Sequence, residues 1–200
     1  MALVTSHHAD EQVAGGVRRA ARQLEDAGYI IDEADPPSIT EAAETWAKMI
    51  AWDSLLTWDQ VSPLLSSDSR LQMEILFDLI GPVSSSEYRQ TYVRRLAIGR
   101  AWAKFQQQYP LMLGPVSTQP PFRVGSDLSP GGLESILRSM SLVVAVNLIG
   151  LPAVVVPVGI GDGMPQAIQI IGRRYREDLC LDAAAALEER TPRLTPILSA

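Results

Sequence analysis

The feature that most constrains the fold is a pair of apolar runs joined by a glycine turn. Ala153 to Val158 is rich in valine, a β-branched residue that favours strands. Gly159 to Gly163 has glycine at every second position and predicts a turn, and Ala167 to Ile171 predicts a second strand. Because the turn joins them directly, we expect an antiparallel hairpin. The valine run also predicts that the first strand is buried on both faces.

Helical periodicity dominates the first half of the sequence. Apolar residues recur every three or four positions from Asp10 to Ala27, and Gly28 follows where a helix C-cap glycine is expected. Tyr29 to Ile31 then predicts a short strand, which the prolines after Asp35 end. A helix followed by a strand is typical of an α/β layer.

Two capping boxes predict further helix starts, Ser38 with Glu41 and Ser84 with Glu87. A third helix is expected from about Ser69 to Ile80. The first and second of these helices carry apolar and aromatic stripes that we interpret as core. The stripes are Trp46, Met49 and Ile50 on the first, and Tyr88, Tyr92, Leu96, Trp102, Phe105 and Tyr109 on the second.

The second half is rich in proline, glycine and valine. Leu111 to Leu113 predicts a strand that Gly114-Pro115 stops, and 117–132 predicts a long polar loop of the kind that is often functional. An apolar helix is expected over 133–149. Leu179, Ala183 and Leu187 then place a closing helix against the sheet. No repeat or linker divides the chain.

Composition narrows the possible partners and the compartment. The 200 residues carry 17 basic and 23 acidic side chains, a net charge of -6, so nucleic acid is not expected as a partner. A single cysteine, Cys180, excludes an internal disulfide. The N-terminus does not resemble a signal peptide, and Leu142 to Val158 is too short and interrupted to span a bilayer. We therefore expect a cytoplasmic protein without membrane segments.

No self-contained catalytic group emerges from the residues. His7 and His8, the only histidines, are adjacent and chelate poorly, so no metal site is expected, and no cofactor is predicted. The glycines of 159–163 lead into a strand, whereas a dinucleotide loop must open into a helix. Cys180 lies between leucines and is interpreted as a packing residue. An unrelated enzyme built on Cys180 or a carboxylate is the least favoured alternative.

An ordered set of motifs near the C-terminus resembles the C-terminal segment of amidase signature enzymes. The motifs are Asn147, Gly150-x-Pro152, Pro157-x-Gly159, Gly163-x-Pro165 and Gln169-x-x-Gly172, followed by a helix that ends at Glu188. Upstream, the strand that ends at Pro115 and the helix that ends at Gly28 are similar to that family as well. The resemblance covers nearly the whole chain and is clearest after residue 109.

The resemblance implies an α/β fold with a mixed sheet flanked by helices, and a single partial domain over 1–200. Residues 1–109 would form its helix-rich part, and 110–200 the strand hairpin with its closing helix. Enzymes of this family cleave carboxylic amides with two serines and a lysine. The serines lie in a glycine- and serine-rich loop that this sequence does not contain. Neither Lys48 nor Lys104 matches the lysine in position, so no catalytic residue is assigned.

Two functional hypotheses follow from this resemblance. In the first, the chain is part of an amide hydrolase, inactive alone and completed by an N-terminal half that is supplied by a second chain or by sequence lost from this reading frame. In the second, it is a non-catalytic remnant or interaction module, alone or as a homo-oligomer, that retains the scaffold. In either case an uncovered sheet face would favour association. Ser117, Thr118 and Gln119 are the candidate contacts to a small amide substrate. The alternative is that they only stabilise the turn.

Overall fold

The computed structural model describes residues 1–4 and 9–192, which form two compact units. The first unit comprises Met1–Pro36, Phe105–Pro120 and the chain from Leu151 onward, and the second comprises Pro37–Lys104 and Pro121–Gly150. The long helix α5 (Ser85–Gln108) begins in the second unit and ends in the first.

The first unit is built on a mixed five-stranded sheet with the strand order β2-β1-β3-β5-β4. Its strands are β1 (Ala2–Leu3), β2 (Asp32–Glu33), β3 (Leu111–Pro115), β4 (Ala153–Gly161) and β5 (Met164–Gly172). The β1 strand pairs in parallel with β2 and β3, and β5 pairs antiparallel with β3 and β4. The predicted hairpin and the α/β class are confirmed.

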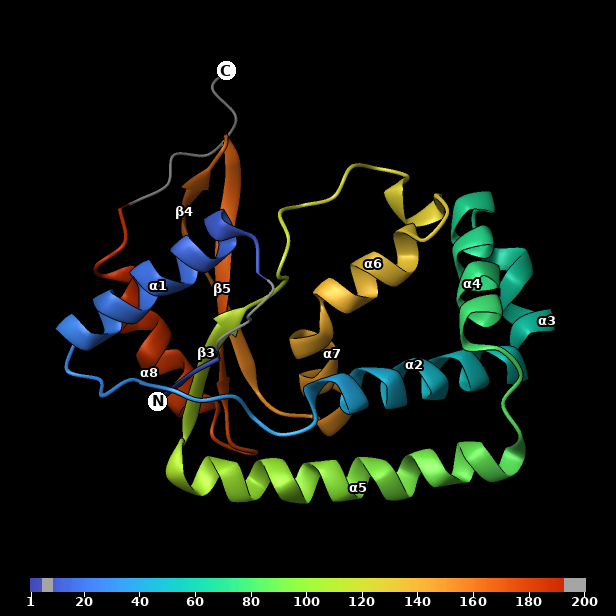
Figure 1. Ribbon diagram of the computed structural model, residues 1–200, viewed down its shortest axis with the longest axis horizontal. Helices are drawn as coiled ribbons and strands as arrows, with labels where there is room; N and C mark the ends of the chain where they lie inside the picture. Colours follow the sequence, from blue (N-terminus) through green and yellow to red (C-terminus); the bar gives the residue numbers. More distant parts are fainter. Residues whose placement is uncertain (5–8, 193–200) are drawn as a thin grey trace. The chain divides into compact units, whose positions relative to one another are not determined.

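Helices α1 (Glu11–Asp26) and α8 (Glu177–Glu188) flank one face of this sheet (Figure 1). The core between them is formed by apolar side chains of both helices and of β3, β4 and β5. The predicted first and closing helices are thus confirmed. Asp10 caps α1 by accepting a hydrogen bond from the Gln12 N–H, and Gly28 takes the expected left-handed conformation, with φ of 93°.

Three expectations about the strands are wrong. Tyr29 to Ile31 precede the strand, because pairing with Ala2 and Leu3 places β2 at Asp32–Glu33. The β4 strand is not buried on both faces. It is an edge strand in this chain, with Val156 buried and Val155 54% exposed. The β3 strand also runs through Gly114 to Pro115 instead of stopping before them.

The second unit is helical. It contains α2 (Ile39–Leu56), α3 (Trp58–Val61), a 3-10 turn at Ser62–Leu64, α4 (Ser67–Ile80), most of α5, a 3-10 turn at Ser126–Leu128, α6 (Gly132–Ser139) and α7 (Ser141–Ile149). The α2 helix packs against α7. The Trp102 indole N–H of α5 donates to the Pro37 carbonyl at 2.7 Å, and the Arg95 guanidinium donates to the Leu148 carbonyl at 2.6 Å.

The predicted helix over 133–149 is two helices. The break falls at Met140, where the Ser139 hydroxyl donates to the Ile136 carbonyl and the Ser141 hydroxyl to the Arg138 carbonyl. Serine side chains that bind helix carbonyls compete with the backbone pattern. In the described part of the chain no single helix could cross a membrane. The α6–α7 pair has the length and composition to do so, but bends by 67°.

The two capping boxes have different outcomes. At Ser84 the box forms, because the Glu87 carboxylate accepts from the Ser84 N–H at 2.8 Å and the Glu87 N–H donates to the Ser84 hydroxyl at 3.2 Å. At Ser38 it does not form, although α2 begins at the next residue. Ser38 has a left-handed backbone, with φ of 59°, and Glu41 instead pairs with Arg94 at 2.9 Å.

The aromatic stripes are only partly core. Trp102 is fully buried, and Trp46, Met49 and Ile50 are half-buried. In contrast, Tyr92 and Leu96 are exposed, so the prediction is wrong for these two side chains. Their helix α5 turns its buried face elsewhere, through Thr91, Ile98 and Trp102.

Candidate functional site

The candidate substrate loop begins where the central strand β3 ends. Ser117 and Thr118 are half-buried, and Gln119 is exposed. The β3 strand lies between β1 and β5 and is buried along its whole length. A loop that leaves the middle of a sheet is therefore held on a rigid support, which is the usual setting for binding residues.

Hydrogen bonds fix the backbone of this loop. The Asp10 N–H, at the cap of α1, donates to the Thr118 carbonyl at 2.8 Å. The Gln119 N–H donates to the Ser117 hydroxyl at 3.1 Å, so Ser117 does stabilise the turn. Within the described residues the Thr118 hydroxyl forms no hydrogen bond, and this side chain could bind a ligand without breaking an internal contact. Contact of these three residues with a substrate stays a prediction.

A buried glutamine holds the start of the loop. Gln169 of β5 is 1% exposed and donates from Nε2 to the Pro115 carbonyl at 2.9 Å. The oxygen of this amide, Oε1, is buried and has no hydrogen-bond partner within the described residues. Because Pro115 offers only an acceptor, the amide has a fixed orientation. Gln169 therefore fixes the point at which the chain leaves the sheet.

A second buried amide lies at the opposite end of the same strand pair. Gln106 of α5 donates from Nε2 to the Gly172 carbonyl at 3.0 Å, and Gly172 pairs with Leu111 of β3. No motif in the sequence marks Gln106 as a functional residue. Its only signal is its position one helical turn after Trp102, on the buried face of α5.

Cys180 is a packing residue, as predicted. It is 2% exposed and belongs to the core between α8 and the sheet. Burial raises the pKa of its thiol to about 11, with smaller contributions from the nearby carboxylates of Glu177 and Asp178. A thiol that stays protonated at neutral pH is a poor nucleophile, so no chemistry is assigned to Cys180.

The serines and lysines of the helical unit do not form a catalytic pair. Ser84 is occupied by its capping interaction with Glu87. The hydrogen bonds from Ser84 lower the pKa of the Glu87 carboxyl, and the charge of Lys48 contributes less. Lys48 and Lys104 are exposed. A base must be held within hydrogen-bond reach of its serine to activate it, and no such contact is observed in the described residues.

Metal and nucleotide sites are not supported by the described residues. They contain no group of three or more histidine, cysteine, aspartate or glutamate side chains placed to hold a metal ion. His7 and His8 lie outside the described residues. The glycines of 159–163 form the β4–β5 turn, with Asp162 at φ of 46° and Gly163 at 76°, and no helix follows them.

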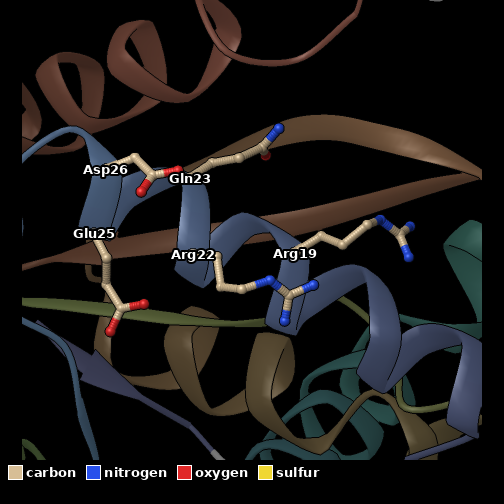
Figure 2. A pocket seen from close by; sticks show the side chains of 5 residues that line it. All are labelled: Arg19, Arg22, Gln23, Glu25 and Asp26. Carbon is tan, nitrogen blue, oxygen red and sulfur yellow. The ribbon is translucent and has the colours of Figure 1, made fainter.

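A shallow depression of about 440 Å³ lies on α1 (Figure 2). It is lined by Arg19, Arg22, Gln23, Glu25 and Asp26, and none of the candidate loop residues borders it. Arg19 donates to the Gln166 side chain at 2.6 Å, and Gln23 donates to the Arg190 carbonyl at 2.9 Å. With two cations, two anions and no nucleophile, it offers no catalytic arrangement.

Comparison with known families matches residues 1–181 to the amidase family. The chain therefore belongs to the amidase family, whose members include the amidase signature enzymes. Indoleacetamide hydrolase from Bradyrhizobium japonicum is 33% identical over 184 residues, which cover 90% of this chain and 40% of that protein. A glutamyl-tRNA(Gln) amidotransferase subunit from Syntrophomonas wolfei is 27% identical, and the match covers 96% of this chain and 44% of that protein. The chain thus spans less than half the length of these relatives.

Solved structures confirm the fold. A bacterial aryl acylamidase of the amidase signature family superposes with a TM-score of 0.76 at 20% identity, covering 96% of this chain and 43% of that one. A glutamyl-tRNA(Gln) amidotransferase subunit from Thermotoga maritima gives a TM-score of 0.74 at 22% identity, covering 96% and 42%. The predicted mixed sheet flanked by helices is the arrangement found in this family.

Proposed function

We propose that the chain forms the C-terminal part of an enzyme that hydrolyses carboxylic amides to acid and ammonia or amine. The observation that carries this proposal is the amidase match, which runs through the sheet, the loop after β3 and the hairpin. In this arrangement the chain supplies one wall of the substrate pocket. The nucleophile and its base come from an N-terminal half.

The chain by itself is expected to be inactive. An unactivated serine hydroxyl is a weak nucleophile at neutral pH. Each missing oxyanion donor removes about 3 kcal/mol of transition-state stabilisation, so a pocket wall without this machinery binds but does not cleave. This chain would therefore contribute the binding residues, and the reacting groups would come from the N-terminal half.

For the substrate we propose a primary amide on an aromatic group, because a relative with one third identity is an indoleacetamide hydrolase. The polar groups of Ser117, Thr118 and Gln119 can donate to an amide carbonyl and accept from an amide N–H. Thr118 is the strongest candidate of the three, since its hydroxyl has no internal hydrogen bond among the described residues.

The test is ammonia release from a panel of aryl and aliphatic amides that includes indole-3-acetamide. The purified chain is assayed alone and mixed with the N-terminal half of an amidase. We expect turnover only in the mixture. Turnover by the chain alone would overturn the assignment of the reacting groups. No turnover in a mixture shown by sedimentation to contain the bound halves would overturn the proposed activity.

Thr118→Val removes the hydroxyl at nearly constant volume and should raise KM or lower kcat in the reconstituted enzyme. Thr118→Ser, which keeps the hydroxyl, is the matched control and should retain most of the activity. Equal kinetics for the valine variant and the parent enzyme would remove Thr118 from the substrate site.

A non-catalytic interaction module is the second candidate. It is favoured by the edge strand β4, which leaves Val155 half exposed and its outer backbone groups open to pairing. Binding of the mixed N-terminal half with no turnover of any amide would support this function over hydrolysis.

A further inference from the structure

The outward face of α5 carries a stripe that no part of its own unit covers. Arg89, Val93, Leu96 and Arg100 follow one another at steps of four, three and four residues, so they share one side of the helix. All four are exposed, Val93 to 65% and Leu96 to 62%. We call these four residues the basic stripe.

The outward face of α4, in the same unit, carries a stripe of opposite charge. Asp68, Leu71, Ile75 and Asp78 follow one another at steps of three, four and three residues. The two aspartates are exposed, Leu71 is 45% exposed and Ile75 is half-buried. We call these four residues the acidic stripe. Figure 1 shows α4 and α5 as separate helices.

The two stripes match in length and in order. At a rise of 1.5 Å per residue, the basic stripe extends about 16.5 Å and the acidic stripe about 15 Å. Each has two apolar side chains between two charged ones. Steps of three and four residues are also the spacing by which two helices pack along a common seam. Laid side by side, the apolar pairs meet and each arginine faces an aspartate.

The arginines of α5 differ in their partners. Arg94 pairs with Glu41 at 2.9 Å, and Arg95 donates to the Leu148 carbonyl at 2.6 Å. In contrast, neither Arg89 nor Arg100 forms a hydrogen bond or ion pair with any described residue. On α4, Asp78 is likewise unpaired there, and Asp68 accepts only from its neighbour Ser67. The charges at the ends of both stripes are therefore available to a partner.

We propose that the acidic stripe of one chain docks on the basic stripe of a second copy. Every copy of the chain carries both stripes. A second copy therefore presents the charges and apolar side chains that each stripe needs as a partner. Two basic stripes, or two acidic ones, would repel each other. In a two-fold dimer the contact forms twice, once in each direction. The proposal does not depend on the amide hydrolysis proposed above.

Charge reversal tests this proposal by sedimentation over a micromolar concentration range at low salt. The parent chain should associate. Arg89→Glu with Arg100→Glu, and separately Asp68→Lys with Asp78→Lys, should each weaken association about tenfold or more. The two double variants mixed together should associate again, because the reversed basic stripe of one now matches the reversed acidic stripe of the other.

The mixing step also tests whether the variants are folded, because unfolded chains would not restore association. The control variant is Arg22→Glu with Arg123→Glu. It makes the same change in net charge as the double arginine variant, but on exposed residues outside both stripes, and should leave association unchanged. Added salt should weaken the parent complex, since exposed ion pairs are screened. A monomeric parent chain, or association that neither reversal changes, would overturn the proposal.

Discussion

Replacement of Gly172 by alanine should destabilise the protein through one identifiable contact. A β-carbon at this position would lie 2.6 Å from Sγ of Cys180 and 3.1 Å from the Arg176 carbonyl oxygen. Favourable contacts between such atoms begin near 3.5 Å, so the thiol or the strand must move by about 1 Å. Both Gly172 and Cys180 are buried, which leaves little room for that movement.

The magnitude follows from the cost of overpacking a core, about 1–3 kcal/mol. For a chain of this size, each kcal/mol lowers Tm by about 2–4 °C. Cys180→Ala alone should cost about 1 kcal/mol through a small cavity. Combined with Gly172→Ala it removes the obstructing sulfur, so the double variant should be more stable than the sum of the single effects by about 1 kcal/mol.

Urea and thermal unfolding of the four proteins measure this coupling. Gly99→Ala is the matched control, because a β-carbon there would lie 3.7 Å from Ile149, an ordinary contact, and alanine favours a helix interior. That variant should be as stable as the parent or slightly more stable. Strict additivity of Gly172→Ala and Cys180→Ala would refute the argument from the sulfur contact.

Three further predictions concern buried or capped polar groups. Gln169→Glu should be much less stable than Gln169→Leu at pH 7, because it places a buried carboxylate against the Pro115 carbonyl oxygen. The difference in stability should shrink near pH 4, where the carboxyl is protonated. Equal urea midpoints for the two variants at both pH values would contradict this prediction. Alkylation of Cys180 in the native protein at pH 8 should be at least 100-fold slower than in denaturant, because a thiol pKa of about 11 lowers the thiolate fraction and burial limits access. Fast labelling would show that the core around Cys180 opens to solvent. The hydrogen bonds from Ser84 lower the pKa of the Glu87 carboxyl below its ordinary 4.5. The native state therefore gains stability from this carboxylate above pH 4.5 and loses it as the pH falls through the lowered pKa. Glu87→Gln should flatten the acid limb of a stability–pH curve, and an unchanged limb would exclude this contribution.

Local patterns in the sequence predict those elements whose determinants are local. The hairpin follows from two apolar runs and the glycines between them, and the Ser84 box forms because Ser84 and Glu87 need only each other. The Ser38 box has the same pattern but fails. There Glu41 is used by Arg94, a residue more than 50 positions away that no local window includes.

The burial of a side chain depends on neighbours that are distant in sequence. Local patterns therefore fail to predict which apolar residues are buried. The valine run of β4 is typical of a strand covered on both sides, yet only one face of β4 packs against the core that α1 and α8 form, so Val156 is buried and Val155 is exposed. Likewise, Tyr92 and Leu96 belong to the predicted stripe of α5 but are exposed. The candidate loop was predicted from its position after a strand, whereas Gln106 could be found only when Gly172 was placed beside it.

Gly172 shows why a family motif can carry information that periodicity does not. Its N–H donates to the Pro152 carbonyl at 2.9 Å, its carbonyl accepts from Gln106 at 3.0 Å, and Cys180 occupies the space where a side chain would begin. Three segments that are far apart in the sequence thus meet on one residue, and each restricts it for a different reason. No single pattern of apolar or polar residues encodes that combination. A glycine at the end of a strand appears in sequence only as a stop signal, and its role in joining the sheet to α5 and α8 is explained by these contacts.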